Sequence, residues 1–362
     1  MRNHSRHINR KTYNLLHKKC FLTFLFFCIV AVSPLKSAAQ DCYRLVFWNV
    51  ENLFDIWDDS TRNDDGFTPA GKNRWSQKRY KTKLNHLYQT IAALGDDSSG
   101  HLNMPLVVGL AEVENDKVLR DLTKGTPLRR FNYGYIHFDS PDARGIDNAL
   151  LYRRSLYTPF YTKAINVCSE RRSTRDILLV EGADINGDTL IFLVNHFPSK
   201  RGGETAEKHR ANIAGRLRHI MDTLSAAHKA ATIIVMGDFN ASPDDTQIMG
   251  KIAKDDDNSF VNLMANAKSG EGSYNYQGHW SFIDQIIVSK NITTVNPNSP
   301  FLLKTRQGQS FRAKFLLIDD DKNLSKKVFR TYLGIKYQGG YSDHLPVYID
   351  LYRNKKSLTG RD

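Results

Sequence analysis

The stretch that decides the fold reads Ile233-Ile234-Val235-Met236-Gly237-Asp238-Phe239-Asn240. Its first four residues make a short apolar run of strand length, and three of them are β-branched,. The run stops at Gly237, and an acid and an amide, Asp238 and Asn240, follow at once. In an open α/β sheet, ligand sites form outside the strand ends, so the pattern predicts a buried strand that delivers polar groups to a site. An ordinary turn after the strand is the alternative, because Asn, Asp and Pro favour turns.

Length and composition are those of a globular protein. The 362 residues suffice for one large domain or two ordinary ones, with 41% hydrophobic and 25% charged residues,. We find no internal repeat and no low-complexity segment, which argues against repeat, fibrous and disordered classes,. The sequence also lacks a cysteine/histidine zinc pattern,.

The first 39 residues form a segment of a different kind. A basic stretch without acids precedes an apolar run over 21–32, and the small residues Ser37-Ala38-Ala39 follow. This order is typical of a secretory signal peptide, so we expect cleavage here and a secreted or periplasmic protein. An uncleaved membrane anchor is the alternative, but the apolar run is short for a membrane span.

Loss of residues 1–39 would change the charge and the cysteine content. The formal charge of +13 comes from 51 basic and 38 acidic residues. Seven of the basic residues and none of the acids lie in 1–39, which leaves 44 against 38, or +6. Such a mildly basic protein suits a polyanionic substrate without requiring one. Cys42 and Cys168 would remain, and an oxidising compartment permits a disulfide, but sequence positions alone do not show that they are close.

Two more predicted strands end in polar residues in the same way. The strand over 43–50 ends in Asn49 and Glu51, which point the same way on an extended backbone,. The strand over 106–113 carries Glu112 near its end, where a buried carboxylate costs free energy unless it is paired or bound to a metal,.

The pattern recurs in the second half of the chain. The strand over 190–196 ends in Asn195 and His196, and Asp343 and His344 precede the last strand, over 347–351. Asp284 is embedded in an apolar strand over 281–288, and a buried aspartate needs a partner,. Each residue alone fits a solvated strand end or a structural histidine. Repeated in order, an apolar strand followed by polar groups indicates one composite site.

Helices are predicted over 76–94 and 204–228. In the first, Tyr80, Leu84 and Leu87 recur at steps of four and three, which gives one buried stripe,. Lys83 and the neighbouring basic residues fall outside that stripe, so we expect them to be solvated. Residues 290–335 contain many lysines and arginines but few motifs.

These motifs resemble those of the endonuclease/exonuclease/phosphatase superfamily, which includes pancreatic-type deoxyribonuclease and bacterial sphingomyelinases. The resemblance covers about 41–351 and implies an α/β four-layer sandwich of two packed mixed β-sheets flanked by helices. It implies a single catalytic domain over 40–352 with a polar tail over 353–362. The matching stretches are Trp48-Asn49-Val50-Glu51-Asn52, Ala111-Glu112-Val113, Asn195-His196-Phe197, Gly237-Asp238-Phe239-Asn240, Ile283-Asp284 and Ser342-Asp343-His344-Leu345-Pro346.

The resemblance also implies a divalent metal. Glu112 matches the principal Mg²⁺ ligand of the family, with Asn49 and Glu51 nearby and Asp343 on the same ion or on a second one. An all-oxygen ligand set suits Mg²⁺, with Mn²⁺ or Ca²⁺ as alternatives. Glu51 departs from the family pattern, because several branches have aspartate or another residue there.

The catalytic roles are carried over in the same way. His344, oriented by Asp284, matches the histidine–aspartate pair and would act as general base or contact the scissile phosphate. Asp238 would position and deprotonate the attacking water, or protonate the leaving oxygen. Hydrogen bonds to the phosphate would come from Asn240, Asn195 and His196.

The expected activity is metal-assisted hydrolysis of a phosphodiester, with DNA or RNA as the substrate. Arg144, in the turn-rich loop 139–148, is a candidate phosphate contact because a planar guanidinium matches phosphate oxygens. Asp147 in the same loop is a second substrate-binding candidate. Trp280, in the aromatic loop 274–280, is a candidate for stacking on bases.

Two other classes are open. A phosphatase or phospholipase C-type hydrolase would act on inositol phosphates, sphingomyelin or another phosphoester. A non-catalytic binding protein on the same fold is disfavoured by the intact set of acids, amides and histidines. We expect a monomer without stable membrane insertion after signal cleavage.

Overall fold

The computed structural model describes residues 42–95, 103–169, 173–200, 203–253, 259–266, 268, 270–293 and 299–354. The chain divides into two units, Met1–Asp41 and Cys42–Asp362, and all described residues belong to the second. The predicted signal peptide and most of the predicted tail therefore lie outside the described residues. None of the described helices is both long enough and apolar enough to cross a membrane.

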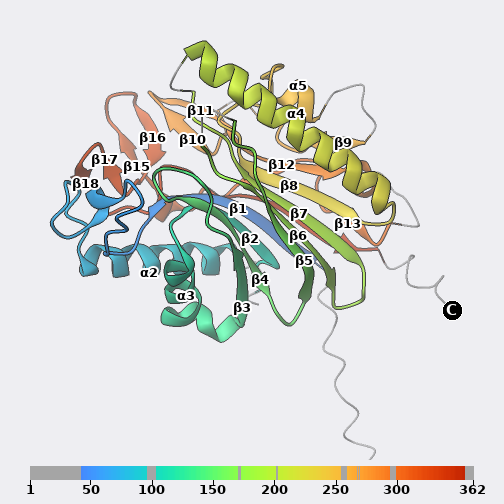
Figure 1. The fold of residues 1–362 in the computed structure, drawn as a ribbon, viewed down its shortest axis with the longest axis horizontal. Helices are drawn as coiled ribbons and strands as arrows, with labels where there is room; N and C mark the ends of the chain where they lie inside the picture. The colour runs from blue at the N-terminus through green and yellow to red at the C-terminus, as the bar shows by residue number, and fades with distance from the viewer. Residues whose placement is uncertain are drawn as a thin grey trace, which may run out of the picture. The chain divides into compact units, whose positions relative to one another are not determined.

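The first of two mixed β-sheets contains the beginning and the end of the described chain (Figure 1). Its strand order is β13-β19-β1-β2-β4-β3, and β14 also pairs with β19. β1 runs parallel to β2 and antiparallel to β19, where Cys42 pairs with Tyr352. The strands are β1 (Cys42–Leu53), β2 (Val107–Val113), β3 (Tyr133–His137), β4 (Asp147–Arg153), β13 (Phe301–Leu303), β14 (Gln309–Ser310) and β19 (Val347–Arg353).

The second sheet has the strand order β5-β6-β7-β8-β12-β9. β7 and β8 run parallel, with Asn195 opposite Gly237, and the other neighbours are antiparallel. Each sheet therefore has one parallel pair whose strands finish together. The strands are β5 (Tyr157–Ile165), β6 (Ile177–Asp184), β7 (Thr189–His196), β8 (Thr232–Asp238), β9 (Phe260–Asn262) and β12 (Asp284–Ser289).

Strand alternation builds the core between the sheets. On β1, Phe47 joins the cluster that also contains Met236 of β8, whereas its neighbour Trp48 joins a cluster with the helices on the outer face. On β8, Val235 belongs to a third cluster, on the outer face of the second sheet. Because side chains alternate along a strand, both faces of each sheet are buried.

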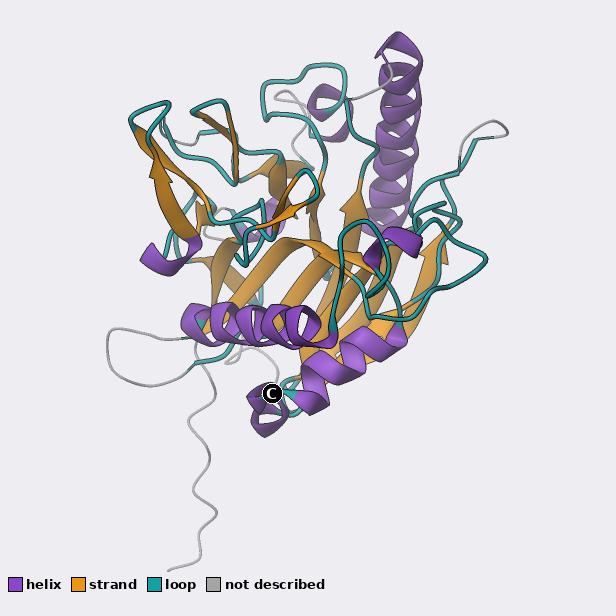
Figure 2. Ribbon diagram, turned by 90° about the vertical axis from the view of Figure 1, so that its left-hand side faces the viewer, coloured by secondary structure: helices purple, strands orange, loops and turns teal. Residues whose placement is uncertain are grey.

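Helices cover the two outer faces, as Figures 1 and 2 show. Two lie on the first sheet, and two lie on the second. Layers of helix, sheet, sheet and helix confirm the predicted α/β sandwich. The helices are α2 (Gln77–Leu94), α3 (Asp116–Gly125), α4 (Gly203–Ala227) and α5 (Met249–Ile252).

Helix α2 confirms one prediction and corrects another. Its stripe of Tyr80, Leu84 and Leu87 is buried, and Ser76 caps its start by accepting a hydrogen bond from the Arg79 N–H,. Lys83, expected to be solvated, is only 1% exposed. It lies three residues after Tyr80 and four before Leu87, so it shares their face of the helix.

The chain after β9 is more broken than the sequence predicted. The strand expected over 281–288 is two elements, because Ser281 pairs with Tyr274 in a hairpin and β12 begins only at Asp284. Residues 290–335, which carry few motifs, contain further short hairpins. The hairpin strands are β10 (Tyr274–Tyr276), β11 (His279–Ser281), β15 (Leu317–Asp320), β16 (Ser325–Val328), β17 (Tyr332–Leu333) and β18 (Lys336–Tyr337).

The two remaining cysteines are not joined to each other among the described residues. Burial raises the pKa of the Cys42 thiol to about 11. Cys168 instead takes part in hydrogen bonds with its own loop, through Asn166 and Thr174. The fold of the described unit therefore does not include the disulfide that the sequence permitted.

Substitution of Gly237 tests how tightly β7 packs against β8. A Cβ at this position would lie far inside van der Waals contact of the Asn195 carbonyl oxygen, which is backbone and cannot move alone. We expect Gly237→Ala to lower the free energy of unfolding by about 1–3 kcal/mol, as other overpacked core sites do. Urea unfolding followed by circular dichroism measures this.

Gly215→Ala is the matched control. Gly215 lies on the exposed side of α4, with open space where a Cβ would stand. Alanine there should stabilise the helix by about 0.5–1 kcal/mol. Equal effects of the two substitutions would contradict the packing at Gly237.

Candidate active site

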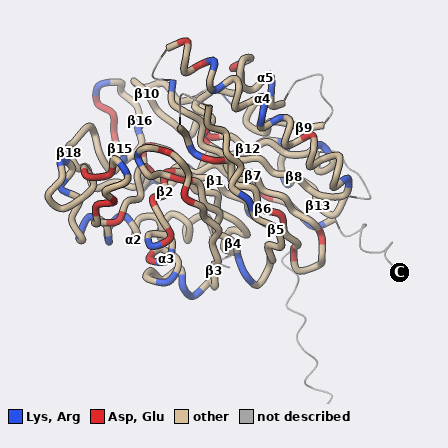
Figure 3. Tube along the Cα trace, viewed as in Figure 1, with Lys and Arg blue, Asp and Glu red and all other residues tan. Residues whose placement is uncertain are grey.

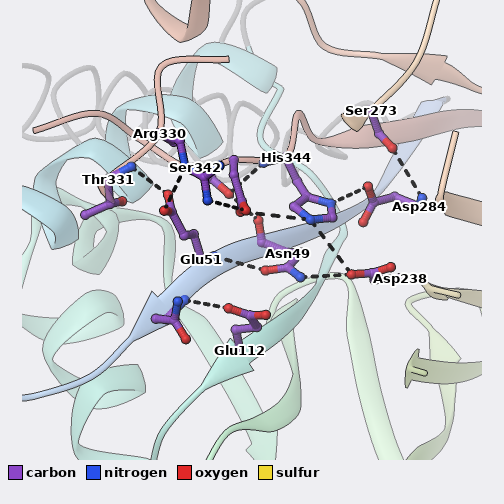
Figure 4. A network of polar contacts seen from close by, with 12 residues as sticks. Asn49, Glu51, Glu112, Asp238, Ser273, Asp284, Arg330, Thr331, Ser342 and His344 are labelled. Carbon is purple, nitrogen blue, oxygen red and sulfur yellow. Dashed lines mark hydrogen bonds and ion pairs between the residues drawn. The ribbon is translucent and has the colours of Figure 1, made fainter. Parts of the chain in front are cut away.

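The ends of β1, β2, β7 and β8 meet at one edge of the sandwich. Asn49 Nδ2 donates to Asp238 Oδ2 at 3.0 Å and so links the two sheets (Figure 4). His196 Nε2 lies 3.6 Å from the same Asp238 oxygen and 3.9 Å from Glu112 Oε1. Four of the residues singled out from the sequence, although far apart along the chain, therefore share one small region.

His344 joins this group through Asp284. Its Nδ1 is 2.7 Å from Asp284 Oδ2, and its Nε2 is 3.9 Å from both Asp238 Oδ2 and Asp343 Oδ1 (Figure 4). The loop that carries His344 is fixed because Ser342 Oγ donates to the Asn49 carbonyl and accepts from the His344 N–H. This contact reproduces the histidine–aspartate pair expected from the sequence.

The pKa values of the two histidines, His344 and His196, are shifted in opposite directions. Burial alone would lower the pKa of His344, but the carboxylates of Asp284 and Asp343 raise it well above its ordinary value. Burial and the charges of Arg175 and Arg144 lower the pKa of His196 well below its ordinary value. At neutral pH the site thus holds one imidazolium and one neutral imidazole, a division suited to acid–base chemistry.

Asp238 lies between these two rings. It is 2% exposed, and burial together with the charge of Asp284 raises its pKa to about 7. Its carboxylate is held in place because its Oδ1 accepts from the Asn240 N–H at 2.9 Å. A carboxyl group that titrates near neutrality can accept and release a proton during a reaction.

The backbone at the strand ends is strained. Glu51, Asn52, Glu112 and Asn240 all have φ between 49° and 65°, and they are four of the eight non-glycine residues with positive φ among those described. Such backbone costs of order 1 kcal/mol or more for a residue with a Cβ, and it concentrates at functional sites. At Glu112 it coincides with a register shift between β2 and β4 that turns the carboxylate inward, toward the Asn52 N–H.

Unsatisfied polar atoms mark the same place. Asn195 Oδ1, His196 Nδ1 and Asp284 Oδ1 are buried without a hydrogen-bond partner among the described residues. Each such atom costs roughly 1–3 kcal/mol unless a water, ion or ligand reaches it. Together with carboxylate and amide oxygens, which suit hard divalent cations, they fit a site that holds a metal ion.

The carboxylates differ in how free they are to bind a metal. Glu112 is partly exposed, and its Oε1 faces only the neutral His196 within ion-pair distance among the described residues. Glu51 is 3% exposed, and its two oxygens accept from the N–H groups of Thr331 and Tyr332 at 2.6 and 3.1 Å. A second group of possible ligands, His137, Asp139 and Asp147, lies at the ends of β3 and β4.

Arg144 and Asp147, the two substrate-binding candidates of the 139–148 loop, differ in exposure and in their contacts. Arg144 is about half exposed, and its charge reaches His196, as the lowered pKa of that histidine records. Asp147 is buried, accepts hydrogen bonds from the backbone and hydroxyl of Ser140, and lies 3.3 Å from His137 Nε2, so it shapes the 139–148 loop.

The aromatic residue against the site is Tyr274 rather than Trp280. The Tyr274 ring centroid lies 4.9 Å from that of His344. Trp280 packs on a small cluster with Leu316 and Leu345, under the guanidinium of Arg312 at 4.0 Å. Both belong to the β10–β11 hairpin, so the sequence located the aromatic element but not its inward residue.

The side chains of Asn195 and Asn240 make hydrogen bonds other than the phosphate contacts that the family resemblance implied. Asn195 Nδ2 donates to the carbonyls of Leu193 and Met236 and thus holds β7 to β8. Asn240 Nδ2 donates to the Phe197 carbonyl at 3.0 Å. Both side chains therefore position the strand ends, and Asn195 has no N–H left for a phosphate.

Sequence reasoning did not place three cations beside the carboxylates of the site or the strand ends that carry it. Arg175 is 7% exposed and donates to Asp142 and to the Phe197 carbonyl. Lys83 and Arg330 lie beside Glu51. The spacing of Lys83 within the α2 stripe was an available signal, whereas the motif-poor setting of Arg175 and Arg330 offered none.

Glu114, two residues beyond Glu112, turns away from this group. Its Oε2 accepts from the Asp55 N–H at 2.5 Å, and Asn115 caps the helix that follows. Burial, followed by the charge of Asp55, raises the pKa of Glu114 to about 8.

Known proteins share this fold. Residues 44–353 match the family described as the Endonuclease/Exonuclease/phosphatase family, whereas no curated protein matches the sequence. A family protein from Bacteroides thetaiotaomicron superposes with a TM-score of 0.54 at 16% identity, over 87% of this chain and 96% of that one. A mannosyl-6-phosphatase from the same organism gives 0.53 at 16% identity, over 85% and 99%. TDP2 from D. rerio, complexed with a single strand DNA product, gives 0.53 at 15% identity, over 86% and 99%.

Asp284→Asn tests the charge state of His344. Removing the carboxylate removes the main charge that raises the pKa of His344, so we expect that pKa to fall,. Histidine ring resonances followed by NMR between pH 5 and 10 measure the shift. A titration curve of His344 that is unchanged in the variant would contradict the assignment.

Glu114→Gln tests burial at the neighbouring carboxylate. Because the pKa is raised on folding, folded Glu114 keeps a proton that the unfolded chain loses, and its contribution to stability declines as pH rises from about 4 to 8,. Glutamine avoids this loss, so the variant should gain on the order of 2 kcal/mol at pH 8 and little at pH 4.5.

Thermal unfolding at the two pH values measures this difference. The control is Glu204→Gln at the exposed start of α4, where no pH-dependent gain is expected. A gain for Glu114→Gln that is equal at both pH values would contradict the raised pKa.

Proposed function

Since the chain belongs to the endonuclease/exonuclease/phosphatase family, a family of phosphoester hydrolases, we propose that it is a divalent-metal-dependent phosphodiesterase that cleaves nucleic acid. One observation carries this proposal. The Asp284–His344 pair, Asp238 and Glu112 are linked through Asn49 and His196 by contacts of 2.7–3.9 Å. Acid, base and candidate metal ligand therefore lie within reach of a single phosphate.

Different residues of the site have different roles in hydrolysis. Glu112, with Asn49 beside it, would hold Mg²⁺, Mn²⁺ or Ca²⁺, which when bound polarises a phosphate oxygen. Asp238 takes the proton of the attacking water, because its pKa near 7 suits a general base,. His344, kept as an imidazolium by Asp284, donates from Nε2 to the phosphate as negative charge builds there,. The neutral His196 contacts the phosphate without adding charge.

The surroundings favour a polyanionic substrate. Lys and Arg are interspersed with Asp and Glu along the described chain (Figure 3), so the cations relevant to substrate binding are those placed at the site. Arg144 comes from the loop before β4, and Arg330 comes from the segment before β17. A nucleic acid offers successive phosphates to cations on separate loops, and Tyr274 gives a base a surface for stacking. The D. rerio protein with the same fold was solved with a single strand DNA product.

The sequence of residues 1–39 supports export as part of the proposal. An exported nuclease would act outside the cytoplasm, where Mg²⁺ and Ca²⁺ both suit an all-oxygen site. The residual charge of +6 over residues 40–362 favours approach to a polyanion,.

One observation favours a second candidate, a phospholipase C-type hydrolase. Leu333 and Ile335 in the β17–β18 hairpin are 62% and 70% exposed. The hairpin starts directly after Thr331, whose N–H binds Glu51, so its apolar tip is close in sequence to the site. Exposed apolar groups beside a phosphoester site suit a lipid interface.

Supercoiled plasmid DNA incubated with Mg²⁺ and the chain from Gln40 onward tests the proposal. We expect nicking that EDTA abolishes and that His344→Ala reduces at least about a hundredfold, the contribution of a general acid or base. His279→Ala, on the exposed strand of the β10–β11 hairpin, should keep full activity.

The same assay includes single-stranded DNA, RNA, sphingomyelin vesicles and a sugar 6-phosphate. A folded protein that cleaves none of the nucleic acids would overturn the nuclease proposal. Cleavage of sphingomyelin alone would favour the second candidate.

A further inference from the structure

Arg330 lies between two carboxylates that the sequence assigned to a metal. Its Nη2 is 2.9 Å from Asp343 Oδ2, and its Nε is 3.6 Å from Glu51 Oε1 (Figure 4). Arg330 comes from the segment that leads into β17, outside the strands and loops that carry its two partners. One guanidinium therefore bridges the end of β1 and the loop that carries His344.

A second cation supports the same carboxylates from behind. Lys83 is 1% exposed, and its Nζ donates to Thr331 Oγ1 and to the Tyr341 carbonyl, each at 2.6 Å. It is close enough to interact with Glu51, Asp343 and Glu112. These hydrogen bonds fix the two ends of the segment that contains the β17–β18 hairpin. Two carboxylates thus face two cations of the chain itself.

The Glu112 side of the site is balanced differently. Among the described residues no lysine or arginine lies within ion-pair distance of Glu112, whose Oε1 lies 3.9 Å from His196 Nε2. The nearby Arg175 directs its N–H groups to Asp142 and to the Phe197 carbonyl. A divalent ion is stabilised where carboxylates lack protein cations, and repelled where cations already balance them.

We propose that Arg330 takes the place of a second metal ion, so that the protein binds one divalent cation, at Glu112, and presents Arg330 to the substrate phosphate from the Asp343 side. This inference rests on the proposed function for the role of Arg330 in catalysis, but the ion count stands apart from it. Glu51 is then an anchor for Arg330, Thr331 and Tyr332 rather than a metal ligand.

Arg330 has the means to contact a phosphate. Its side chain is about one-third exposed, although its Nε is buried beside Glu51. A guanidinium offers five donors in a plane that matches two phosphate oxygens. The carboxylate of Asp343 holds it near His344, whose Nε2 lies 3.9 Å from the other Asp343 oxygen.

Manganese counts test the proposal without requiring activity. Titration with Mn²⁺, followed by electron paramagnetic resonance of the free ion and by calorimetry, should give one site in the wild type and none in Glu112→Gln. Arg330→Met should gain a second, weaker site, because Glu51 and Asp343 lose the charge that excludes an ion. Arg330→Lys should keep one site.

Matched variants guard against trivial causes. Arg120→Met removes an arginine that pairs with Asp116 on the surface of α3, and should leave the count at one. Circular dichroism reports folding, and Arg330→Gln, which keeps hydrogen-bond donors without the charge, replaces Arg330→Met if that variant unfolds. Two sites in the wild type, or one site in the neutral Arg330 variants, overturn the proposal.

Kinetics separate this inference from the proposed function. If nucleic acid is cleaved, Arg330→Met should lower kcat about a hundredfold at saturating Mn²⁺, as loss of a charge-stabilising donor does, while Arg120→Met stays at the wild-type rate. If no phosphoester is cleaved but the ion counts are as expected, the proposed function fails and the one-ion assignment stands. Cleavage of nucleic acid by a protein that binds two ions would support the proposed function and overturn the one-ion assignment.

Discussion

The hydrogen bond from Asn49 to Asp238 is the interaction on which the site depends, because it joins strands of two different sheets near their ends. Neither strand contributes a complete site alone. The pairing requires β1 and β8 to finish at the same edge, and the shared core around Phe47 and Met236 sets that alignment. A slip of one residue in either sheet would turn every side chain over, exchanging inner for outer. The chemistry at the edge is therefore a consequence of packing some distance from it.

Electrostatics then separate groups of the same type. His344 and His196 are both buried and both near Asp238, yet one is charged and the other is neutral. The difference comes from their other neighbours, a carboxylate pair for His344 and two arginines for His196. Likewise Glu51 and Glu112 lie near the ends of parallel strands of one sheet, but backbone N–H groups occupy both oxygens of Glu51 and only one oxygen of Glu112. Equivalent positions in a sheet thus acquire different functions through the loops that cover them.

Much of this was predictable where the information is local. Apolar runs that end in Asn49, Glu112, His196 and Asp238 reveal both the strands and the polar edge, because strand length and burial follow from a few consecutive residues. The layers follow from alternation and from the helix stripes. Lys83 shows where local reasoning fails, since the carbonyl and the hydroxyl that make its burial tolerable come from the far end of the chain,.

The same limit applies to the loops. Which aromatic of the β10–β11 hairpin turns inward depends on the position of His344, 70 residues after Tyr274. The hydrogen bonds of Asn195 follow from β7 lying parallel to β8. Arg330 gains one partner from the first described strand and the other from a residue 13 positions after it. No sequence window contains these relations.

The pairing of β1 with β19 has a consequence for folding during synthesis of the chain. The first described strand needs the last one beside it, so the first sheet is incomplete until the ribosome has made β19,. Until then β1 lacks a neighbour along one edge, and its apolar faces lack their full cover. The first sheet, which begins with the first described strand, is therefore completed only after every strand of the second sheet has been synthesised.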